Sequence, residues 1–156
     1  MKLKIKKKLF NSQHIKFIDK METFEDFLDK GIGFRCHFNL GKITKVEPKR
    51  TSKQKTPFSI EKLIHRLCFS QVKSKFAMQV LLACKNIPSG KTVTYSELAK
   101  IIGKPKSYRA VGSALAKNPF FYLIPCHRVV GKNNMLNYKW GSSLKKSILT
   151  LEGSLP

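Results

Sequence analysis

The sequence contains few acidic residues. Its 156 residues include 9 Asp and Glu against 31 Lys and Arg, which gives a formal net charge of +22. The excess is not confined to a basic tail, because residues 73–156 carry 14 basic residues and two acids, Glu97 and Glu152. A charge of this size exceeds what solubility requires, so it favours a polyanionic partner over a merely solvated basic surface.

Long apolar runs are also absent. No stretch approaches the roughly 20 apolar residues of a membrane-spanning helix, and the N-terminal lysines are not followed by the apolar core of a secretory signal peptide. We therefore expect no membrane partner and a reducing intracellular location, cytoplasmic or, in a eukaryote, nuclear. The four cysteines lack Cys-x-x-Cys and zinc-finger spacing, which predicts free thiols and neither a metal nor a cofactor.

The first half of the chain predicts a small sheet with helices. Hydrophobic residues make up 42% of the sequence, an ordinary share for a globular protein. Phe24, Phe27 and Leu28 would share one face of a helix, and Asp26 follows Thr23 at the spacing of a capping box. In chain order, the expected elements are a strand over 1–8, a second over 15–18, a helix from 23 to 31, a strand pair over 34–46 with a hairpin turn at 39–42, and an exposed connector over 48–57.

The second half predicts mostly helices. Ser59 and Ser74 stand at N-cap positions before helical periodicity, and residues 94–97 form a capping box that opens a helix closing at Gly103. A short link leads to a further helix over 107–117. Two short helices joined in this way in a basic segment are typical of a helix-turn-helix, although a plain αα-hairpin fits equally well. The remaining expected elements are a break at 118–119, a hairpin or wing turn at 131–134 and a final helix ending at 152–153.

The most informative stretch is 123–130, Leu-Ile-Pro-Cys-His-Arg-Val-Val. Proline removes a hydrogen-bond donor and stiffens the backbone, so a buried strand does not normally carry Pro-Cys-His in its middle. We interpret the stretch as an extended segment interrupted to aim Cys126. A thiol becomes a strong nucleophile only as a thiolate, and His127 and Arg128 are near enough in sequence to favour that form. A buried cysteine that acts as a small hydrophobe is the alternative.

Together, these motifs resemble those of the O6-alkylguanine-DNA alkyltransferases, also called methylated-DNA–protein-cysteine methyltransferases. The segments that match in order and spacing are 93–99 (VTYSELA), 109–112 (RAVG), 118–119 (NP), 124–130 (IPCHRVV), Tyr138 and 152–153 (EG). The resemblance covers roughly residues 76–153 and goes with an α+β fold. We expect an N-terminal α/β domain over 1–70, with a small sheet and helices, and a mostly helical winged helix-turn-helix domain over 73–156.

The resemblance implies a function. Members of this family bind duplex DNA, rotate an O6-alkylated guanine out of the stack and transfer the alkyl group irreversibly to a cysteine; O4-alkylthymine is a second expected substrate. The implied reaction is one transfer per molecule, by a monomer whose partner is double-stranded DNA containing alkylated guanine. The alternatives are a non-catalytic relative that only recognises alkylated DNA and lacks the acceptor cysteine, a winged-helix regulator, and a Cys-His hydrolase.

The resemblance also implies roles for single residues. Cys126 corresponds to the alkyl acceptor, and His127, through a water held by Glu152, to the group that takes the thiol proton. Tyr95 would donate to guanine N3 and Arg109 would replace the extruded base; a packed ring and a phosphate contact are the respective alternatives. The resemblance also implies DNA contacts by Asn118, Ser113 and Lys106, and Asn118 would in addition be a hinge. The residues implied to line the substrate pocket are Val129, Tyr138, Lys139, Trp140 and Lys145.

Two features depart from the pattern of the family. Trp140 stands where many members have glycine, and Lys139 where some have serine, so we expect a pocket that tolerates large alkyl groups less well. The zinc ligands of some members have no clear match in the N-terminal part of this chain, which again predicts no metal.

Overall fold

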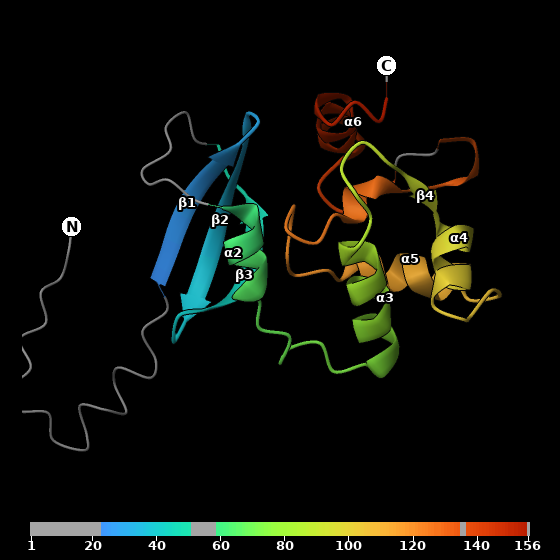
Figure 1. Ribbon diagram of the computed structural model, residues 1–156, viewed down its shortest axis with the longest axis horizontal. Helices are drawn as coiled ribbons and strands as arrows, with labels where there is room; N and C mark the ends of the chain where they lie inside the picture. Colours follow the sequence, from blue (N-terminus) through green and yellow to red (C-terminus); the bar gives the residue numbers. More distant parts are fainter. Residues whose placement is uncertain (1–22, 51–58, 135–136, 156) are drawn as a thin grey trace, which may run out of the picture.

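The computed structural model describes residues 23–50, 59–134 and 137–155. Its elements are, in chain order, β1 (Thr23–Asp29), β2 (Ile32–Asn39), β3 (Lys42–Pro48), α2 (Ile60–His65), α3 (Lys75–Lys85), β4 (Val93–Thr94), α4 (Tyr95–Ile101), α5 (Tyr108–Ala116), the 3-10 helix η1 (Cys126–Arg128), β5 (Val129–Val130), the 3-10 helix η2 (Lys132–Asn134) and α6 (Ser142–Leu151). The architecture is α+β, as the sequence predicts. The three-stranded sheet lies at one side with α2 beside it, and α3, α4 and α5 lie at the other (Figure 1). Within the described ranges, no helix is long and apolar enough to cross a membrane.

Tight turns connect the three strands of the sheet, which run antiparallel in the order β1-β2-β3. Each turn places two residues at positive φ: Lys30 (47°) with Gly31 (80°), and Leu40 (47°) with Gly41 (74°). Glycine reaches this region without steric strain, and two-residue turns of this kind match the twist of the strands they join. β2 buries alternate side chains against the core, namely Ile32, Phe34, Cys36 and Phe38.

The predicted helix over 23–31 is wrong, because this segment is strand β1 and the start of the first turn. Phe27 faces the core whereas Phe24 is 59% exposed, so the apolar residues that would share a helical face lie on both faces of the strand. The turn at Lys30 and Gly31 brings β1 into an antiparallel ladder with β2, and this pairing overrides the local helical pattern. The expected strands over 1–8 and 15–18, and most of the expected connector, lie outside the described residues.

The edge of β3 opposite β2 binds two other segments. The Val46 amide donates to the Pro119 carbonyl oxygen at 2.8 Å, and the Phe121 amide donates to the Val46 carbonyl oxygen at 3.2 Å. Nearer the start of β3, Ile43 makes backbone hydrogen bonds of 2.8 and 2.7 Å with the chain on either side of Leu67. The segment that follows α5 is therefore fixed to the sheet.

Side-chain caps begin α3 and α4 as the sequence predicts, whereas Ser59 stands at the N-cap position of α2 without a side-chain cap hydrogen bond. The Ser74 hydroxyl accepts from the Ala77 amide at the start of α3, and Thr94 with Glu97 forms a full capping box at the start of α4. Gly103, at φ 70°, lies in the turn after α4, and α5 begins a few residues later. The two helices are thus short and joined by a tight turn, as expected for a helix-turn-helix.

The stretch around Cys126 differs from the expected extended segment. Cys126–Arg128 forms one turn of 3-10 helix, and Val129–Val130 then forms β5, which pairs in parallel with β4. Pro125, at φ −78° and ψ 60°, turns the chain just before the cysteine. The predicted turn at 131–134 follows and contains Asn133 at φ 66°.

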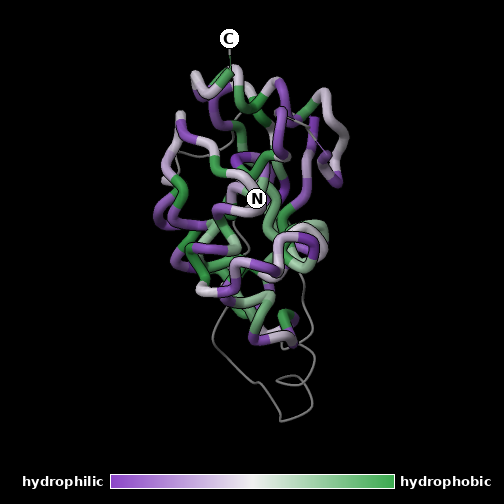
Figure 2. Tube along the Cα trace, turned by 90° about the vertical axis from the view of Figure 1, so that its right-hand side faces the viewer, coloured by the Kyte–Doolittle hydropathy of each residue, from purple (hydrophilic) through white to green (hydrophobic). Residues whose placement is uncertain are grey.

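One apolar core runs from the sheet into the helices. Its largest fully buried apolar side chains are Phe34, Ile43, Leu81, Leu98, Phe120, Phe121, Leu123, Ile124, Ile148 and Leu149. Burial of a side chain of this size contributes about 1.5–3 kcal/mol to stability. Hydrophilic and hydrophobic stretches alternate along the coloured part of the trace in Figure 2, and both halves of the sequence carry an excess of positive charge. The domain boundary expected between residues 70 and 73 stays a prediction.

Candidate active site

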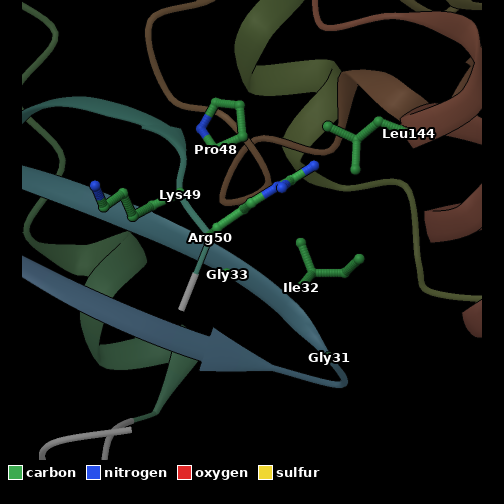
Figure 3. A pocket seen from close by; sticks show the side chains of 7 residues that line it. All are labelled: Gly31, Ile32, Gly33, Pro48, Lys49, Arg50 and Leu144. Atoms are coloured by element: carbon green, nitrogen blue, oxygen red, sulfur yellow. The ribbon is translucent and has the colours of Figure 1, made fainter. Parts of the chain in front are cut away.

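Two cavities have nearly equal volumes, and their linings distinguish them. One, of about 660 Å³, lies between the sheet and α6, and the Arg50 side chain extends across it toward Leu144 (Figure 3). Its lining offers two cations, Lys49 and Arg50, but no thiol, hydroxyl or carboxylate group. The other, of about 670 Å³, is lined by Tyr95, Tyr108, Arg109, Gly112, Ser113, Leu115, Ala116, Cys126, Asn137, Tyr138 and Lys139. The second cavity has the groups needed for chemistry.

Four parts of the chain form the wall of the second cavity. Tyr95 comes from the first turn of α4, Arg109 and Ser113 from α5, Cys126 from η1, and 137–139 from the loop that precedes α6. The two helices of the helix-turn-helix and the thiol of Cys126 therefore border the same space.

The Cys126 side chain is almost buried and is held by two polar neighbours. It is 7% exposed, Asn118 Nδ2 donates to its sulfur at 3.2 Å, and its thiol lies 4.0 Å from the Tyr138 hydroxyl. Burial raises the pKa of the thiol, and the hydrogen bonds to Asn118 and Tyr138 act in the opposite direction without cancelling it. The resting group is thus a thiol that must lose its proton before it attacks.

Asn118 connects the end of α5 to the Cys126 turn. Its side chain is buried, its Nδ2 also donates to the Ile124 carbonyl oxygen at 3.0 Å, and its Oδ1 accepts from the Phe120 amide at 3.0 Å. One side chain thus binds the backbone at Phe120 and Ile124, both before the cysteine, as well as the sulfur of Cys126. A change at the end of α5 would be transmitted directly to the sulfur.

A buried ion-pair cluster lies behind the cysteine. His127 Nε2 is 3.2 Å from Glu152 Oε1, and Arg128 donates to both oxygens of the same carboxylate at 2.9 and 2.7 Å. Arg128 Nη1 also donates to the Ile87 carbonyl oxygen at 2.5 Å. Burial acts to raise the pKa of Glu152, but the hydrogen bonds from His127 and Arg128 outweigh it and lower that pKa to about 2. Burial lowers the pKa of His127, so the imidazole is neutral at pH 7.

The tautomer of His127 follows from its partner. A carboxylate with a pKa of about 2 only accepts hydrogen bonds, so the proton in the contact with Glu152 belongs to Nε2. Nδ1 then carries the lone pair, and it has no hydrogen-bond partner among the described residues although it is buried. The imidazole therefore offers a base that faces away from the carboxylate.

Comparison with known proteins identifies the family. The family described as "6-O-methylguanine DNA methyltransferase, DNA binding domain" matches residues 75–154, just over half of the chain. The chain belongs to the O6-methylguanine-DNA methyltransferase family. The match covers every side chain described so far around the second cavity.

Individual relatives agree with the family match. The methylated-DNA–protein-cysteine methyltransferase of Methanosarcina acetivorans is 49% identical over 82 residues, 52% of this chain and 53% of that protein. The corresponding protein of Kluyveromyces lactis is 42% identical over 83 residues, 53% of this chain and 44% of that protein. The chain thus spans about half the length of these curated relatives.

A solved structure extends the likeness to the sheet. The crystal structure of Mycobacterium tuberculosis OGT in complex with DNA has a TM-score of 0.65 at 25% identity, over 84% of this chain and 92% of that one. A match over so much of the chain includes residues before 75. The sheet therefore belongs to the shared fold although it carries no family motif.

The methyltransferase motifs place Cys126 and His127 side by side but not in contact. Among the described residues, no hydrogen bond joins the sulfur of Cys126 to the imidazole of His127. Glu152 bonds the imidazole directly, and the expected water between His127 and Cys126 stays a prediction.

The residues expected in the substrate pocket divide into two groups. Tyr138 and Lys139 line the cavity, whereas Val129, Trp140 and Lys145 do not. Trp140 packs edge-on against Phe121 with ring centroids 5.9 Å apart, and Lys139 Nζ lies 4.8 Å from the centre of the Trp140 ring. The bulk of the tryptophan thus lies behind the wall.

Lys145 is a fully buried cation behind the same wall. Its Nζ donates to the Val129 carbonyl oxygen at 2.6 Å and to the Asn137 carbonyl oxygen at 3.4 Å, so it joins β5 to the loop before α6. Burial lowers its pKa to about 8. Because its charge is held by carbonyl groups and not by a carboxylate, Lys145 keeps a positive field near Cys126.

The residues expected to contact DNA are partly at the cavity. Arg109 and Ser113 line it, and Arg109 Cζ lies 5.7 Å from the centre of the exposed Tyr108 ring. Lys106 lies in the turn between α4 and α5 and is exposed. Asn118 is buried and does not line the cavity, so its side chain is not placed to contact DNA directly.

The sequence did not predict the contacts of two residues of the site, Arg128 and Tyr122. Arg128 was noted only as a neighbour of Cys126, and nothing in its spacing showed that it binds Glu152. Tyr122 stacks on His127, with ring centroids 5.8 Å apart and 16° between the planes. Tyr122 has a positive φ of 64°, and no sequence pattern predicts that a tyrosine adopts this conformation.

Proposed function

We propose that this protein transfers an alkyl group from O6 of an alkylated guanine in duplex DNA to Sγ of Cys126. The carbon–oxygen bond of the lesion breaks, a carbon–sulfur bond forms, and the thiol proton leaves the sulfur. The observation that carries the proposal is the position of Cys126 in the wall of the 670 Å³ cavity that α4 and α5 border. A base rotated out of the helix would enter this cavity, and O4-alkylthymine is a second candidate.

His127 is the proposed acceptor of the thiol proton. It is neutral, Glu152 fixes the proton on Nε2, and Nδ1 is free to accept. A water between Nδ1 and the Cys126 sulfur would carry the proton, because the two groups make no direct contact. Glu152 then stabilises the imidazolium that forms.

Tyr95 is the proposed donor to the departing guanine. It lines the cavity from the first turn of α4, and burial raises its pKa, so it keeps its proton at pH 7. A hydroxyl that donates to guanine N3 lowers the energy of the guanine anion as the carbon–oxygen bond breaks. The anion finally takes up one proton, which balances the proton lost by the thiol.

The test is a stoichiometric transfer experiment. Incubation with a duplex oligonucleotide that contains O6-methylguanine should add one methyl group per molecule, and peptide mapping should place it on Cys126. The product is a thioether without a good leaving group, so transfer should stop after one event. Cys126→Ser should take up nothing, and the matched control Cys68→Ser, changed on the sheet side of the molecule, should react fully. Repeated turnover, or a label on another cysteine, would contradict the proposal.

Arg109 is proposed to fill the gap left by the extruded base. It lies in the first turn of α5 at the rim of the cavity and is exposed. Extrusion costs a few kcal/mol in a paired duplex and less in a single strand. Arg109→Ala should therefore slow repair of a duplex much more than repair of single-stranded DNA. Equal slowing on both substrates would leave Arg109 as a phosphate contact, whose loss reduces the log-log salt slope by about one.

The same mass measurement tests the alternative of a non-catalytic protein that binds alkylated DNA. Such a protein would bind the lesion-containing duplex and remain unmodified. The buried thiol, with a base and a carboxylate behind it, is a set of groups that binding alone does not require.

A further inference from the structure

Tyr122 has a strained backbone next to the active site. Its φ is 64°, a region that bulky side chains rarely adopt, and the Leu123 amide donates to the Phe121 carbonyl oxygen at 2.7 Å across it. A bond between residues two apart with a positive φ at the centre is the strained form of the γ-turn. Strain of this kind persists only where the surroundings demand it.

The strained turn aims the Tyr122 ring at His127. The two rings are stacked, with centroids 5.8 Å apart and 16° between the planes, and Phe34 of β2 lies 5.5 Å from the same tyrosine ring. At the far end of the ring, the hydroxyl donates to Asp29 Oδ2 at 2.6 Å. Asp29 is the last residue of β1, so a group of the sheet is connected through one ring to the imidazole.

The charges around His127 explain what this contact can do. Glu152 favours the imidazolium form, whereas burial and the cations Arg128 and Lys145 disfavour it. The face of an aromatic ring attracts a cation. A carboxylate that accepts from the phenol hydroxyl increases the electron density of that ring, so Asp29 strengthens the attraction.

These groups lie outside the substrate cavity. Asp29, Tyr122, Arg128 and Glu152 instead share a separate cavity of about 310 Å³, which Lys30 and Lys85 also line. They do not touch the space that an extruded base would enter. An effect of Asp29 or Tyr122 on transfer therefore does not come from contact with the base, and the stacked ring gives it a direct route through His127.

We propose that Asp29 and Tyr122 are positioning residues for His127. The Asp29 carboxylate holds the tyrosine ring against the imidazole, which fixes the plane of the imidazole and stabilises the imidazolium that forms when the thiol proton is taken. This inference rests on the proposed alkyl transfer, and it gives the sheet a direct part in the site.

The test compares three single variants and one double variant. Tyr122→Leu removes the ring, whereas Tyr122→Phe and Asp29→Leu each remove the hydroxyl–carboxylate bond, one by deleting its donor and the other by deleting its acceptor. Tyr122→Leu should slow methyl transfer at pH 7 by about 3- to 30-fold, the range of a partly desolvated cation–ring contact. Tyr122→Phe and Asp29→Leu should slow it less and by equal factors. Because both remove the same bond, the double variant should be no slower than either single one.

The pH dependence separates positioning from a loss of packing. A less stabilised imidazolium is a weaker base, so the acid limb of the rate profile should move to lower pH in Tyr122→Leu, and the plateau should fall. Affinity for duplex DNA should be unchanged. Asp26→Asn is the matched control, because it removes another carboxylate of β1, which forms a half-buried pair with Arg35. Its pH profile should overlay that of the wild type.

A measurement without transfer keeps the inference independent of the proposed function. NMR titration of the imidazole should show a lower pKa for His127 in Tyr122→Leu than in the wild type, whether or not the protein accepts methyl groups. An unmoved titration and an unmoved acid limb would overturn the inference, as would additive losses in the double variant. Failure of the wild type to take up a methyl group would overturn the proposed function alone.

Discussion

Two histidine–glutamate pairs in this protein have nearly the same geometry and different surroundings. His37 Nε2 lies 3.0 Å from Glu47 Oε1 on the outer face of the sheet, where the side chains are 24% and 31% exposed. His127 Nε2 lies 3.2 Å from Glu152 Oε1, where they are 0% and 2% exposed. Water competes for the first pair, so its net contribution is about 0–1 kcal/mol. In the second, loss of one partner leaves the other charge or dipole buried without compensation.

The neighbouring lysines repeat the contrast. Lys45 is 53% exposed and lies 2.6 Å from Glu47, whereas Lys145 is fully buried and donates to the carbonyl oxygens of Val129 and Asn137. Contact distances alone therefore do not distinguish the two pairs, whereas burial does.

The largest difference between the two pairs should appear when the carboxylates are neutralised. Glu152→Gln replaces a carboxylate that can only accept by an amide that can also donate, so the tautomer of His127 is no longer fixed, and Arg128 loses its ion-pair partner. Methyl transfer should fall by about 10²–10⁴-fold, the range of general-base assistance. Single-turnover rates with a methylguanine duplex measure this.

Stability should be measured on the same variant. Loss of one partner of a buried pair destabilises by about 3–5 kcal/mol, so urea unfolding shows whether the slow protein is folded at the assay temperature. An unchanged transfer rate in folded Glu152→Gln would mean that the carboxylate serves only the end of α6.

Acid should weaken the buried pair next. The pKa of Glu152 is about 2, below its ordinary value near 4.5, so the unfolded chain binds the proton more tightly than the folded protein does. The stabilisation is complete above about pH 4.5 and is lost as the pH falls toward 2. The free energy of unfolding should therefore drop on the order of 3 kcal/mol further in the wild type than in Glu152→Gln over this window.

The lowered pKa of His127 acts in the same direction at higher pH. Its unfolded form takes up a proton near pH 6.5, before the folded form does, so stability should begin to decline there. Urea titrations at closely spaced pH values follow both steps. Equal slopes for wild type and Glu152→Gln below pH 4.5 would contradict the assignment of the lower step.

Alkali should reveal the buried lysine. The pKa of Lys145 is lowered to about 8 from an ordinary value of 10.5, so the unfolded chain binds more protons between these values and stability from this group rises with pH. The stability difference between wild type and Lys145→Met should grow by up to about 3 kcal/mol from pH 8 to 10.5.

Buried thiols act against this rise of stability with pH, both in the wild type and in Lys145→Met. Burial raises the pKa of Cys36, Cys84 and Cys126, and each then reduces stability at high pH. The difference between the two proteins cancels that contribution. A difference that stays constant across the window would show that Lys145 titrates normally.

The smallest effect is expected at the exposed pair. Glu47→Gln should change the free energy of unfolding by less than about 1 kcal/mol, and added salt should reduce even that. Methyl transfer should proceed at the wild-type rate. A loss of transfer in this variant would remove the contrast, because it would tie the outer face of the sheet to the reaction.

The features that sequence alone predicted are local. The capping box at Thr94 and Glu97 needs only residues three apart, and the Pro125-Cys126 step depends on the fixed φ of proline. The family motifs then supplied the site, since Cys126 and Tyr95 do meet at one cavity.

The features that sequence missed depend on distant partners. β1 has a helical pattern of apolar residues, yet the turn at Lys30 and Gly31 and the ladder with β2 decide its conformation. Lys145 has the sequence of an ordinary surface lysine on α6, and only the fold shows that carbonyl oxygens enclose it. The bond from Tyr122 to Asp29 joins residues 93 positions apart, beyond any local pattern.

The pairing along β3 has a consequence for association between molecules. An uncovered strand edge is a template on which another chain can add a strand, a common start of aggregation. Here the backbone near Ile43 and Val46 already bonds the chain at Leu67 and Phe120. The contacts that fix the segment before Cys126 thus also prevent a second copy of the chain from pairing with this edge. A mutation that frees that segment would disorder the site and would also expose a strand edge that promotes aggregation.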